Sequence, residues 1–424
     1  MHILFVNDFY APFIGGTERQ VQLLARLFAQ RGYTTSVATT WHEELLEQQD
    51  DAGPTVYRLK GLTTSVPWFS NDQKRRLHPP FPDPITTWRL RRLVGKLRPD
   101  VVHSAGWISY SVAAALLGQK IPLIVSARDY CFFCPTHALL YHGRICSGPA
   151  PLKCLKCATD TYGTPRFIAA TKALGATVGV NVCRHLLKRK ASAIHCASTY
   201  MQRVMQEHLG GQTGSHAARS ALTWAIIPSF RENTDQQHPS PGFVERLPAT
   251  PYILFVGTFR NYKGLGVLLR AYQRLNSPPP LVLIGTVAGS AEAELPPVLP
   301  LGVSVLQDLP HSDVMAAWEH SLFGVAPSLW PEPFGSVIHE AMSKGKAVIT
   351  SNTGGPPDMI IHGECGLLIQ PGDVAALTQS MQYLIDNVEG RERLGQAARV
   401  RAELFTARAV IPRFEQLYRS VSGN

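Results

Sequence analysis

The sequence predicts an α/β protein made of two facing Rossmann-like, doubly wound parallel-sheet domains with a cleft between them. The chain has 424 residues, whereas a single hydrophobic core usually stops growing near ~250–300 residues. Short apolar runs without polar alternation recur, each followed by a helical pattern, as in parallel sheets covered on both faces. This repetition occurs twice, on either side of a polar, proline-bearing segment at 231–251.

The first strand is expected at Ile3–Val6, before a helix in which Val21, Leu24 and Phe28 fall at helical spacing. Further strands are expected at the remaining apolar runs: Val101-Val102, Leu123–Val125, Ile253–Val256, Leu281–Ile284, Val303–Leu306, Phe323–Ala326 and Ala347–Ile349. The domains are therefore placed at 1–230 and 252–404, with 231–251 as the linker and hinge. In such folds, ligands bind at the carboxyl ends of the strands.

The composition narrows the possible classes of ligand and the expected location of the protein. Lys and Arg exceed Asp and Glu by +10, so part of the surface should attract phosphates, nucleic acid or acidic lipids. The charged fraction of 17% argues against long disordered tails. No secretory signal and no apolar run of bilayer length is visible, which predicts a cytoplasmic protein.

Two glycine-framed loops follow predicted strands. After the first strand, Gly15 and Gly16 open a helix whose N-terminal N–H groups suit an anion, although a simple strand-to-helix turn would look the same. In the second half, the loop at 257–264 carries Arg260 and Lys263, which suit a diphosphate. A solvated basic loop is the alternative.

The segment 327–342 is the most informative. Glu332 lies in a loop before a helix expected to begin near Gly335, and Glu340 lies about one turn inside that helix. A diphosphate at the helix N-terminus would leave both carboxylates within reach of sugar hydroxyls. Open backbone amides are expected nearby, at Phe334, Gly335, Ser336 and Val337. Alternatively, the charge of Glu332 only interacts favourably with the helix dipole, and Glu340 only lies on a solvated face of the helix.

These motifs, taken together, resemble the retaining glycosyltransferases of the GT-B fold, specifically glycosyltransferase family 4, over nearly the whole chain. Glu332 and Glu340 match the family's E-x7-E signature, so the resemblance implies that Glu332 contacts the donor sugar near the reacting carbon and that Glu340 binds the ribose. Lys263 matches the diphosphate-binding lysine. Gly15 and Gly16 match the glycine loop of the other domain.

The resemblance implies a transfer of sugar from a nucleotide-diphosphate donor to a hydroxyl of a carbohydrate or lipid-linked acceptor, in glycan, polysaccharide or glycolipid assembly. It implies no metal cofactor for catalysis. The acceptor would bind at 1–230 and the nucleotide sugar at 252–404, and a C-terminal helix at 405–424 would return to the first domain.

The sequence also departs from the family pattern. Where the family often has His-Asp after the strand at Leu123–Val125, this chain has Arg128 and Asp129. Arginine cannot act as a base at neutral pH, but it can bind a phosphate, orient an acidic acceptor or pair with Asp129. With Glu332, these two residues form the predicted catalytic set. Arg260 stands two places after the position of the family's arginine.

Five of the eight cysteines lie between residues 131 and 157. Paired C-x2-C spacings let two thiolates from a tight turn bind one metal, as in structural zinc sites. The predicted ligands are therefore Cys134, Cys146, Cys154 and Cys157, with Cys131 as a further one. An iron–sulfur cluster and reduced core thiols are the alternatives.

Basic residues gather in the first half, around 74–76, 89–98 and 184–190. The interspersed leucines there allow peripheral binding to an anionic membrane, or ordinary amphipathic helices facing the core. Nucleic acid binding is not expected, because it would leave the glycine loops and carboxylates unexplained. A catalytically silent binding protein with the same fold, recruiting a partner or a membrane, is the alternative function.

Overall fold

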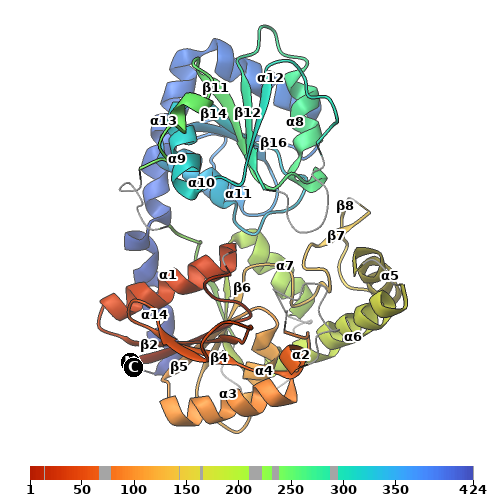
Figure 1. The fold of residues 1–424 in the computed structure, drawn as a ribbon, viewed down its shortest axis with the longest axis vertical. Coiled ribbons are helices and arrows are strands. Elements are labelled where there is room, and N and C mark those ends of the chain that lie inside the picture. Colours follow the sequence, from red (N-terminus) through yellow and green to blue (C-terminus); the bar gives the residue numbers. More distant parts are fainter. Residues whose placement is uncertain are drawn as a thin grey trace. The chain divides into compact units, whose positions relative to one another are not determined.

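In the computed structural model, the chain divides into two compact units (Figure 1). The first unit comprises Met1–Tyr141, Cys146–Arg231 and Ile411–Asn424, and the second comprises His142–Ile145 and Glu232–Val410. The structure describes residues 1–13, 15–65, 78–142, 144–162, 166–209, 222–231, 238–286 and 295–423. Part of the predicted linker, at 232–237, and the basic run at 74–76 lie outside this set.

The first unit contains an eight-stranded sheet in the order β10-β9-β6-β5-β1-β2-β4-β3. Neighbouring strands are parallel except for β3 and β4, which are antiparallel. The strands are β1 (His2–Asn7), β2 (Thr34–Thr40), β3 (Gln48–Asp50), β4 (Thr55–Leu59), β5 (Val101–Ala105), β6 (Leu123–Ala127), β9 (Ala191–Cys196) and β10 (Thr223–Ile226). The predicted runs of the first half thus form β1, β5 and β6.

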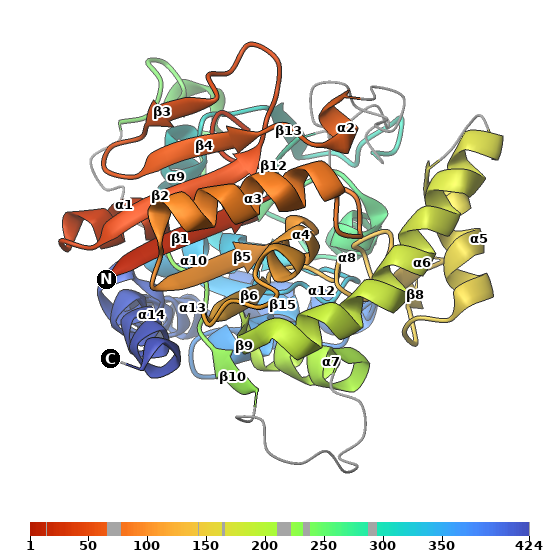
Figure 2. The same ribbon diagram turned by 90° about the horizontal axis from the view of Figure 1, so that it is seen from below.

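Helices lie on both faces of this sheet. The helices of the first unit are α1 (Gly16–Gln30), α2 (Leu62–Ser65), α3 (Pro84–Leu97), α4 (Ile108–Ala115), α5 (Pro151–Tyr162), α6 (Arg166–Lys190), α7 (Thr199–Leu209) and α14 (Ala407–Ser422), and α5 packs against α6. Figure 2 looks onto the face covered by α3 and α4. On the other face, Tyr418 of α14 packs against Phe5 of β1 and Phe28 of α1.

The basic helix α3 uses its apolar face within the first unit. Asp83 caps its N-terminus by accepting hydrogen bonds from the N–H groups of Ile85 and Thr86. Leu90 and Leu93 are buried, so these leucines face the core rather than a membrane. Among the described residues, no helix is long and apolar enough to cross a membrane.

The second unit contains a six-stranded parallel sheet in the order β13-β12-β11-β14-β15-β16. Its strands are β11 (Tyr252–Val256), β12 (Leu281–Gly285), β13 (Val303–Gln307), β14 (Ser321–Ala326), β15 (Ala347–Ser351) and β16 (Leu367–Ile369). Its helices are α8 (Leu265–Tyr272), α9 (His311–His320), α10 (Ser336–Ser343), α11 (Pro356–Met359), α12 (Val374–Asp386) and α13 (Val388–Ala402). Helices α8 and α12 pack together on one face, and α9, α10 and α13 contact the sheet from the other (Figure 1).

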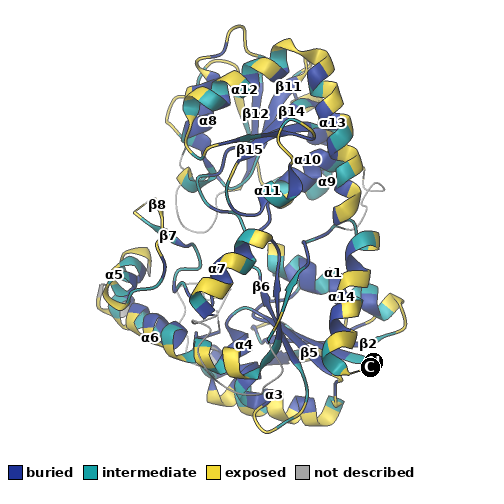
Figure 3. Cartoon of the chain, turned by 180° about the vertical axis from the view of Figure 1, so that it is seen from behind, coloured by how far each residue is buried: buried dark blue, intermediate teal, exposed yellow. Residues whose placement is uncertain are grey.

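Both sheets are buried between their helices (Figure 3), which explains the apolar runs in the sequence and confirms the predicted fold class. In each sheet the strand order reverses beside the unit's first strand, because β1 lies between β2 and β5 and β11 lies between β12 and β14. Ligands of doubly wound sheets bind at the carboxyl ends of the strands at such a point. The loops after β1, β11 and β14 lie at these points, and the loop after β6 leaves the same edge of the first sheet.

Candidate active site

Two loops meet at the carboxyl edge of the second unit's sheet. One follows β11 and carries Arg260 at the N-cap of a 3-10 helix, η3 (Asn261–Lys263); the other follows β14 and carries Glu332. Because β11 and β14 are adjacent parallel strands, the two loops leave the sheet side by side. Lys263 Nζ lies 2.8 Å from Glu332 Oε1. Both side chains are less than one-fifth exposed, at 19% and 17%.

Backbone contacts hold these loops together. The carbonyl oxygen of Tyr262 accepts hydrogen bonds from the N–H groups of Leu329, at 2.8 Å, and Trp330, at 3.1 Å. Gly264 has φ 78°, and a Cβ there would lie 1.9 Å from the carbonyl oxygen of Pro327. Only glycine fits this close approach, so the residue after the lysine fixes how near the two loops come.

The N-terminus of α10 lies immediately after Glu332 in the chain. Gly335, its N-cap, adopts the left-handed conformation at φ 97° and offers no side-chain cap to the helix. Ser336 and Val337 form the first turn, and the preceding Phe334 is buried. An α-helix begins with N–H groups that have no partner within the helix, and its dipole is positive there. This end of α10 therefore suits a phosphate.

Glu340 lies on the buried side of α10. Its side chain is 4% exposed. Its Oε2 accepts a hydrogen bond from Trp318 Nε1 at 3.3 Å, and its Oε1 lies 3.3 Å from His311 Nε2. Both partners belong to α9. No motif in the sequence singled out His311 or Trp318, because only the packing of α9 beside α10 brings them to Glu340.

At the edge of the first unit, α1 begins at Gly16 with Gly15 as its N-cap and without a side-chain cap. The strand before this loop ends close to Asp8, a buried carboxyl group. Asp8 accepts hydrogen bonds from the N–H groups of Trp107, at 2.8 Å, and Ile108, at 2.7 Å, at the start of α4. Burial raises the pKa of Asp8 to about 7, although these two hydrogen bonds oppose the shift.

Arg128 and Asp129 follow β6, but they do not pair with each other. Asp129 Oδ2 lies 3.1 Å from His137 Nδ1. Burial would raise the pKa of Asp129, but His137 holds it below its ordinary value; likewise burial would lower the pKa of His137, but Asp129 raises it. Arg128 instead donates from Nη1 to Ser229 Oγ at 3.1 Å. The sequence did not predict the pairing of Asp129 with His137.

The cysteines around 131–157 have backbone partners. Cys134 Sγ accepts from the N–H of Leu139 at 3.4 Å, and Cys157 Sγ donates to the carbonyl of Leu140 at 3.6 Å. Cys154 and Cys157 lie on α5, one helical turn apart, and not in the tight turn that the sequence predicted. Across the described residues, no three His, Cys, Asp or Glu side chains form a group that could hold a metal. The structure therefore gives no support to the predicted zinc site with Cys146 as a fourth ligand.

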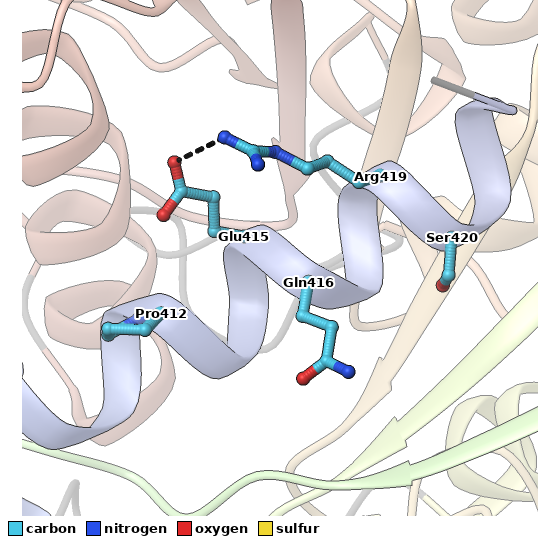
Figure 4. A pocket seen from close by; sticks show the side chains of 5 residues that line it. All are labelled: Pro412, Glu415, Gln416, Arg419 and Ser420. Atoms are coloured by element: carbon cyan, nitrogen blue, oxygen red, sulfur yellow. Dashed lines mark hydrogen bonds and ion pairs between the residues drawn. The ribbon is translucent and has the colours of Figure 1, made fainter.

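A shallow hollow runs along α14, lined by Pro412, Glu415, Gln416, Arg419 and Ser420 (Figure 4). Arg419 and Glu415 form an ion pair at 3.3 Å beside it. All five lining residues come from one helix, and none of them is a predicted site residue. The edges of the two sheets are therefore the better candidates for chemistry.

Two family models match the chain in succession. Residues 15–219 match the glycosyl transferase 4-like domain, and residues 243–401 match the glycosyl transferases group 1. The matched ranges include Gly15, Gly16 and Arg128 in the first half and Lys263, Glu332 and Glu340 in the second.

Curated relatives carry glycosyltransferase names. The chain is 27% identical to D-inositol 3-phosphate glycosyltransferase of Corynebacterium diphtheriae over 76% of its own length and 71% of that protein. It is 38% identical to D-rhamnosyltransferase WbpZ of Pseudomonas aeruginosa, but over only 37% of its own length and 42% of that protein.

Solved structures share the fold over the full chain. Sucrose-phosphate synthase from Thermosynechococcus elongatus superposes with a TM-score of 0.70 at 17% identity, covering 100% of this chain and 99% of that one. Anabaena HepE in complex with UDP does so with a TM-score of 0.66 at 18% identity, covering 100% of both chains. The chain therefore has the GT-B fold of these glycosyltransferases. Its two halves resemble a glycosyl transferase 4-like domain and a group 1 domain.

Proposed function

We propose that this protein is a retaining, metal-independent glycosyltransferase of family 4 that moves a sugar from a nucleotide-diphosphate donor to a hydroxyl acceptor. The pairing of Lys263 with Glu332 at 2.8 Å carries the proposal, because it joins the predicted diphosphate ligand to the predicted sugar contact. The family-model matches and the glycosyltransferase names of the relatives support it. UDP and UDP-glucose complexes of HepE, which has the same fold, support a nucleotide-sugar donor.

In this proposal, Lys263 exchanges Glu332 for the donor diphosphate when the donor binds. In the protein without ligand, the charge of Lys263 is neutralised by Glu332. An incoming diphosphate attracts the ammonium group of Lys263, and the freed carboxylate of Glu332 turns to the hydroxyls of the donor sugar. Arg260 and the N-terminus of α10, from Phe334 to Val337, stabilise the same diphosphate.

The chemical step follows from these contacts. As the bond between the sugar and the diphosphate breaks, negative charge develops on the leaving phosphate, where Lys263, Arg260 and the helix N-terminus stabilise it. The acceptor hydroxyl attacks from the same face, and the leaving phosphate takes its proton, so that configuration is retained. No side chain is assigned as the general base. Glu340 binds the ribose, and Gly15 and Gly16 approach the diphosphate from the first unit.

The acceptor is assigned to the first unit, with Arg128 and Asp129 near the reacting hydroxyl. The proposed acceptor is a carbohydrate or lipid-linked glycan, as in polysaccharide or glycolipid assembly. Exposed apolar residues on one side of α6 suit contact with a membrane that carries such a lipid: Phe167, Leu174, Val178 and Val182. The last turn of α6 carries Lys188 and Arg189, whose charges complement anionic lipids, whereas Lys190 donates to the carbonyl oxygens of Gln119 and Ile121. Sedimentation with anionic and with zwitterionic vesicles tests this, since equal binding to both would contradict it.

A panel of labelled nucleotide sugars, incubated with the purified protein and glycan acceptors, tests the main proposal. Transfer with retained anomeric configuration in the presence of a chelator is the expected result. The absence of both binding and turnover with every donor would favour the alternative, a catalytically silent binding protein of the same fold.

A further inference from the structure

Arg128 is a partly buried cation without a carboxylate partner among the described residues. Its Nη1 donates to Ser229 Oγ at 3.1 Å. Its Nε and Nη2 atoms are buried and have no hydrogen-bond partner in the part of the chain that the structure describes. The neighbouring carboxylate, Asp129, is engaged by His137. Leaving a buried donor without an acceptor costs about 1–3 kcal/mol, and more for a charged group. The ligand-free position of this side chain is therefore energetically unfavourable.

The groups next to Arg128 form a neutral hydrogen-bonded chain. His195 Nε2 lies 2.7 Å from the carbonyl oxygen of Ile227, which can only accept, so this nitrogen carries the proton. His195 Nδ1 then accepts from the hydroxyl of Ser126 at 2.7 Å, which itself accepts from His103 Nε2 at 2.6 Å. His103 Nδ1 accepts from the hydroxyl of Tyr418 at 2.8 Å. This arrangement uses every one of these donors and leaves no negative charge.

The electrostatics agree with this hydrogen-bond chain. Burial, together with the charge of Arg128, lowers the pKa of His103 to about 3 and the pKa of His195 well below its ordinary value. Burial also lowers the pKa of Arg128 to about 10, with the Tyr418 hydroxyl opposing the shift. Arg128 thus remains charged at neutral pH beside two neutral histidines. Among the described residues, no group next to Nε and Nη2 replaces the water that the charge has lost.

We propose that Arg128 binds an oxyanion carried by the acceptor, either a phosphate or a carboxylate. Nε and Nη2 form one edge of the planar guanidinium, which matches two oxygens of such a group bidentately. Arg128 follows β6 at the carboxyl edge of the first sheet, where ligands bind. The assignment to the acceptor rests on the proposed function, because the proposed diphosphate ligands Lys263 and Arg260 belong to the second unit.

The oxyanion requires a movement of Arg128. In the ligand-free protein, Nε and Nη2 face protein atoms, but the residue as a whole is only partly buried. A rotation of the long side chain away from Ser229 presents the same edge to a ligand. The ligand-free position therefore holds the charge in an unfavourable environment, and binding of the anion relieves it.

Thermal unfolding in increasing inorganic phosphate tests this without any turnover, because a ligand that binds only the folded state raises Tm. Sodium chloride at matched ionic strength gives the reference. In the presence of saturating UDP, which occupies the donor site, we expect a saturable phosphate-dependent rise in Tm for the wild type. Arg128→Gln should abolish the rise. Arg128→Lys, which keeps the charge and loses the planar edge, should weaken phosphate binding at least tenfold.

The matched control is Arg91→Gln, which removes an exposed arginine from α3 of the same unit and should leave the rise unchanged. An equal phosphate response in wild type and Arg128→Gln would overturn the proposal. Loss of the response when UDP is added, with weaker UDP binding by Arg128→Gln, would overturn the assignment to the acceptor and place the donor diphosphate at Arg128. A wild type that binds no nucleotide sugar refutes the proposed function, and the phosphate response without UDP still reports on Arg128.

Discussion

The cations at the two sheet edges differ in whether a carboxylate pairs with them among the described residues. At the edge of the second unit, Lys263 is paired with Glu332 at 2.8 Å, and each loop supplies one partner. At the edge of the first unit, Arg128 is partly buried beside neutral groups, and two of its nitrogens are buried without a partner among the described residues. A paired cation must exchange its partner to bind a ligand, whereas an unpaired one is already costly and gains from any anion. The difference predicts that similar substitutions at the two edges act on different properties.

The largest expected effect is on catalysis at the paired edge. Lys263→Met removes a charge that stabilises the leaving diphosphate, so kcat/KM should fall by about 10²–10³-fold. Steady-state kinetics with the donor found in the nucleotide-sugar panel measures this. The control is Lys344→Met, which breaks another lysine–glutamate pair of the second unit, Lys344 with Glu319 at 2.5 Å. Equal kinetics for the two variants would remove Lys263 from the site.

At the unpaired edge, the expected effect is on stability, and it is a gain. Arg128→Met replaces a partly buried charge, two of whose buried nitrogens lack a partner among the described residues, with an apolar side chain of similar length. In buffer free of phosphate, the free energy of unfolding should therefore rise by about 1–4 kcal/mol. Lys263→Met should show no such gain, because it leaves Glu332 without its partner. Chemical denaturation of both variants measures the contrast. A loss of stability in Arg128→Met would mean that the arginine supports the fold.

A smaller effect is expected at Glu340, which the structure holds with His311 and Trp318. Glu340→Ala should weaken binding of the donor's nucleoside diphosphate by roughly ten- to hundredfold, because the proposed role of the carboxylate is to accept hydrogen bonds from the ribose. Calorimetric titration with the nucleoside diphosphate of the donor found in the nucleotide-sugar panel, and with its 2′,3′-dideoxy form, separates this role from a structural one. The dideoxy compound lacks the hydroxyls, so it should bind the wild type and the variant equally. The exposed Glu319→Ala is the control, and a penalty that persists with the dideoxy compound would contradict the assignment.

The sequence predicted the architecture because each buried strand is a short apolar run, and Ile3–Val6 or Phe323–Ala326 can be recognised without knowledge of their neighbours. It also singled out Lys263, Glu332 and Glu340, because short motifs carry them. It could not predict which side chains face these residues. Tyr418 reaches His103 across 315 positions of sequence, and His311 reaches Glu340 through helix packing.

The cysteine spacing shows the same limit. The pair Cys154 and Cys157 predicted a tight turn that grips a metal, but the segment is helix α5. Spacing alone does not distinguish a turn from one face of a helix, because residues three apart lie close together in both. Arg128 is a second example of this limit. The sequence suggested Asp129 as its partner, but in the folded protein Asp129 contacts His137 instead.

The last expected effect is an acid sensitivity of the first unit, which comes from the hydrogen-bonded chain of His103, Ser126 and His195 beside Arg128. His103 has a pKa of about 3 in the folded protein and about 6.5 when unfolded. Its contribution to stability is therefore complete above pH ~6.5 and is lost as the pH falls towards 3, at up to about 1.4 kcal/mol per pH unit. His195 acts in the same direction.

The buried charge of Arg128 opposes protonation of both histidines, so the pH dependence also reports on Arg128. His103→Gln should flatten the acid limb of the stability profile by about one proton, as measured by urea denaturation between pH 4 and 7, whereas the exposed His185→Gln should leave it unchanged. Burial is the larger cause of both lowered pKa values and the charge of Arg128 is the smaller one, so Arg128→Met should flatten the acid limb only slightly. An unchanged slope in that variant would mean that burial alone lowers both pKa values.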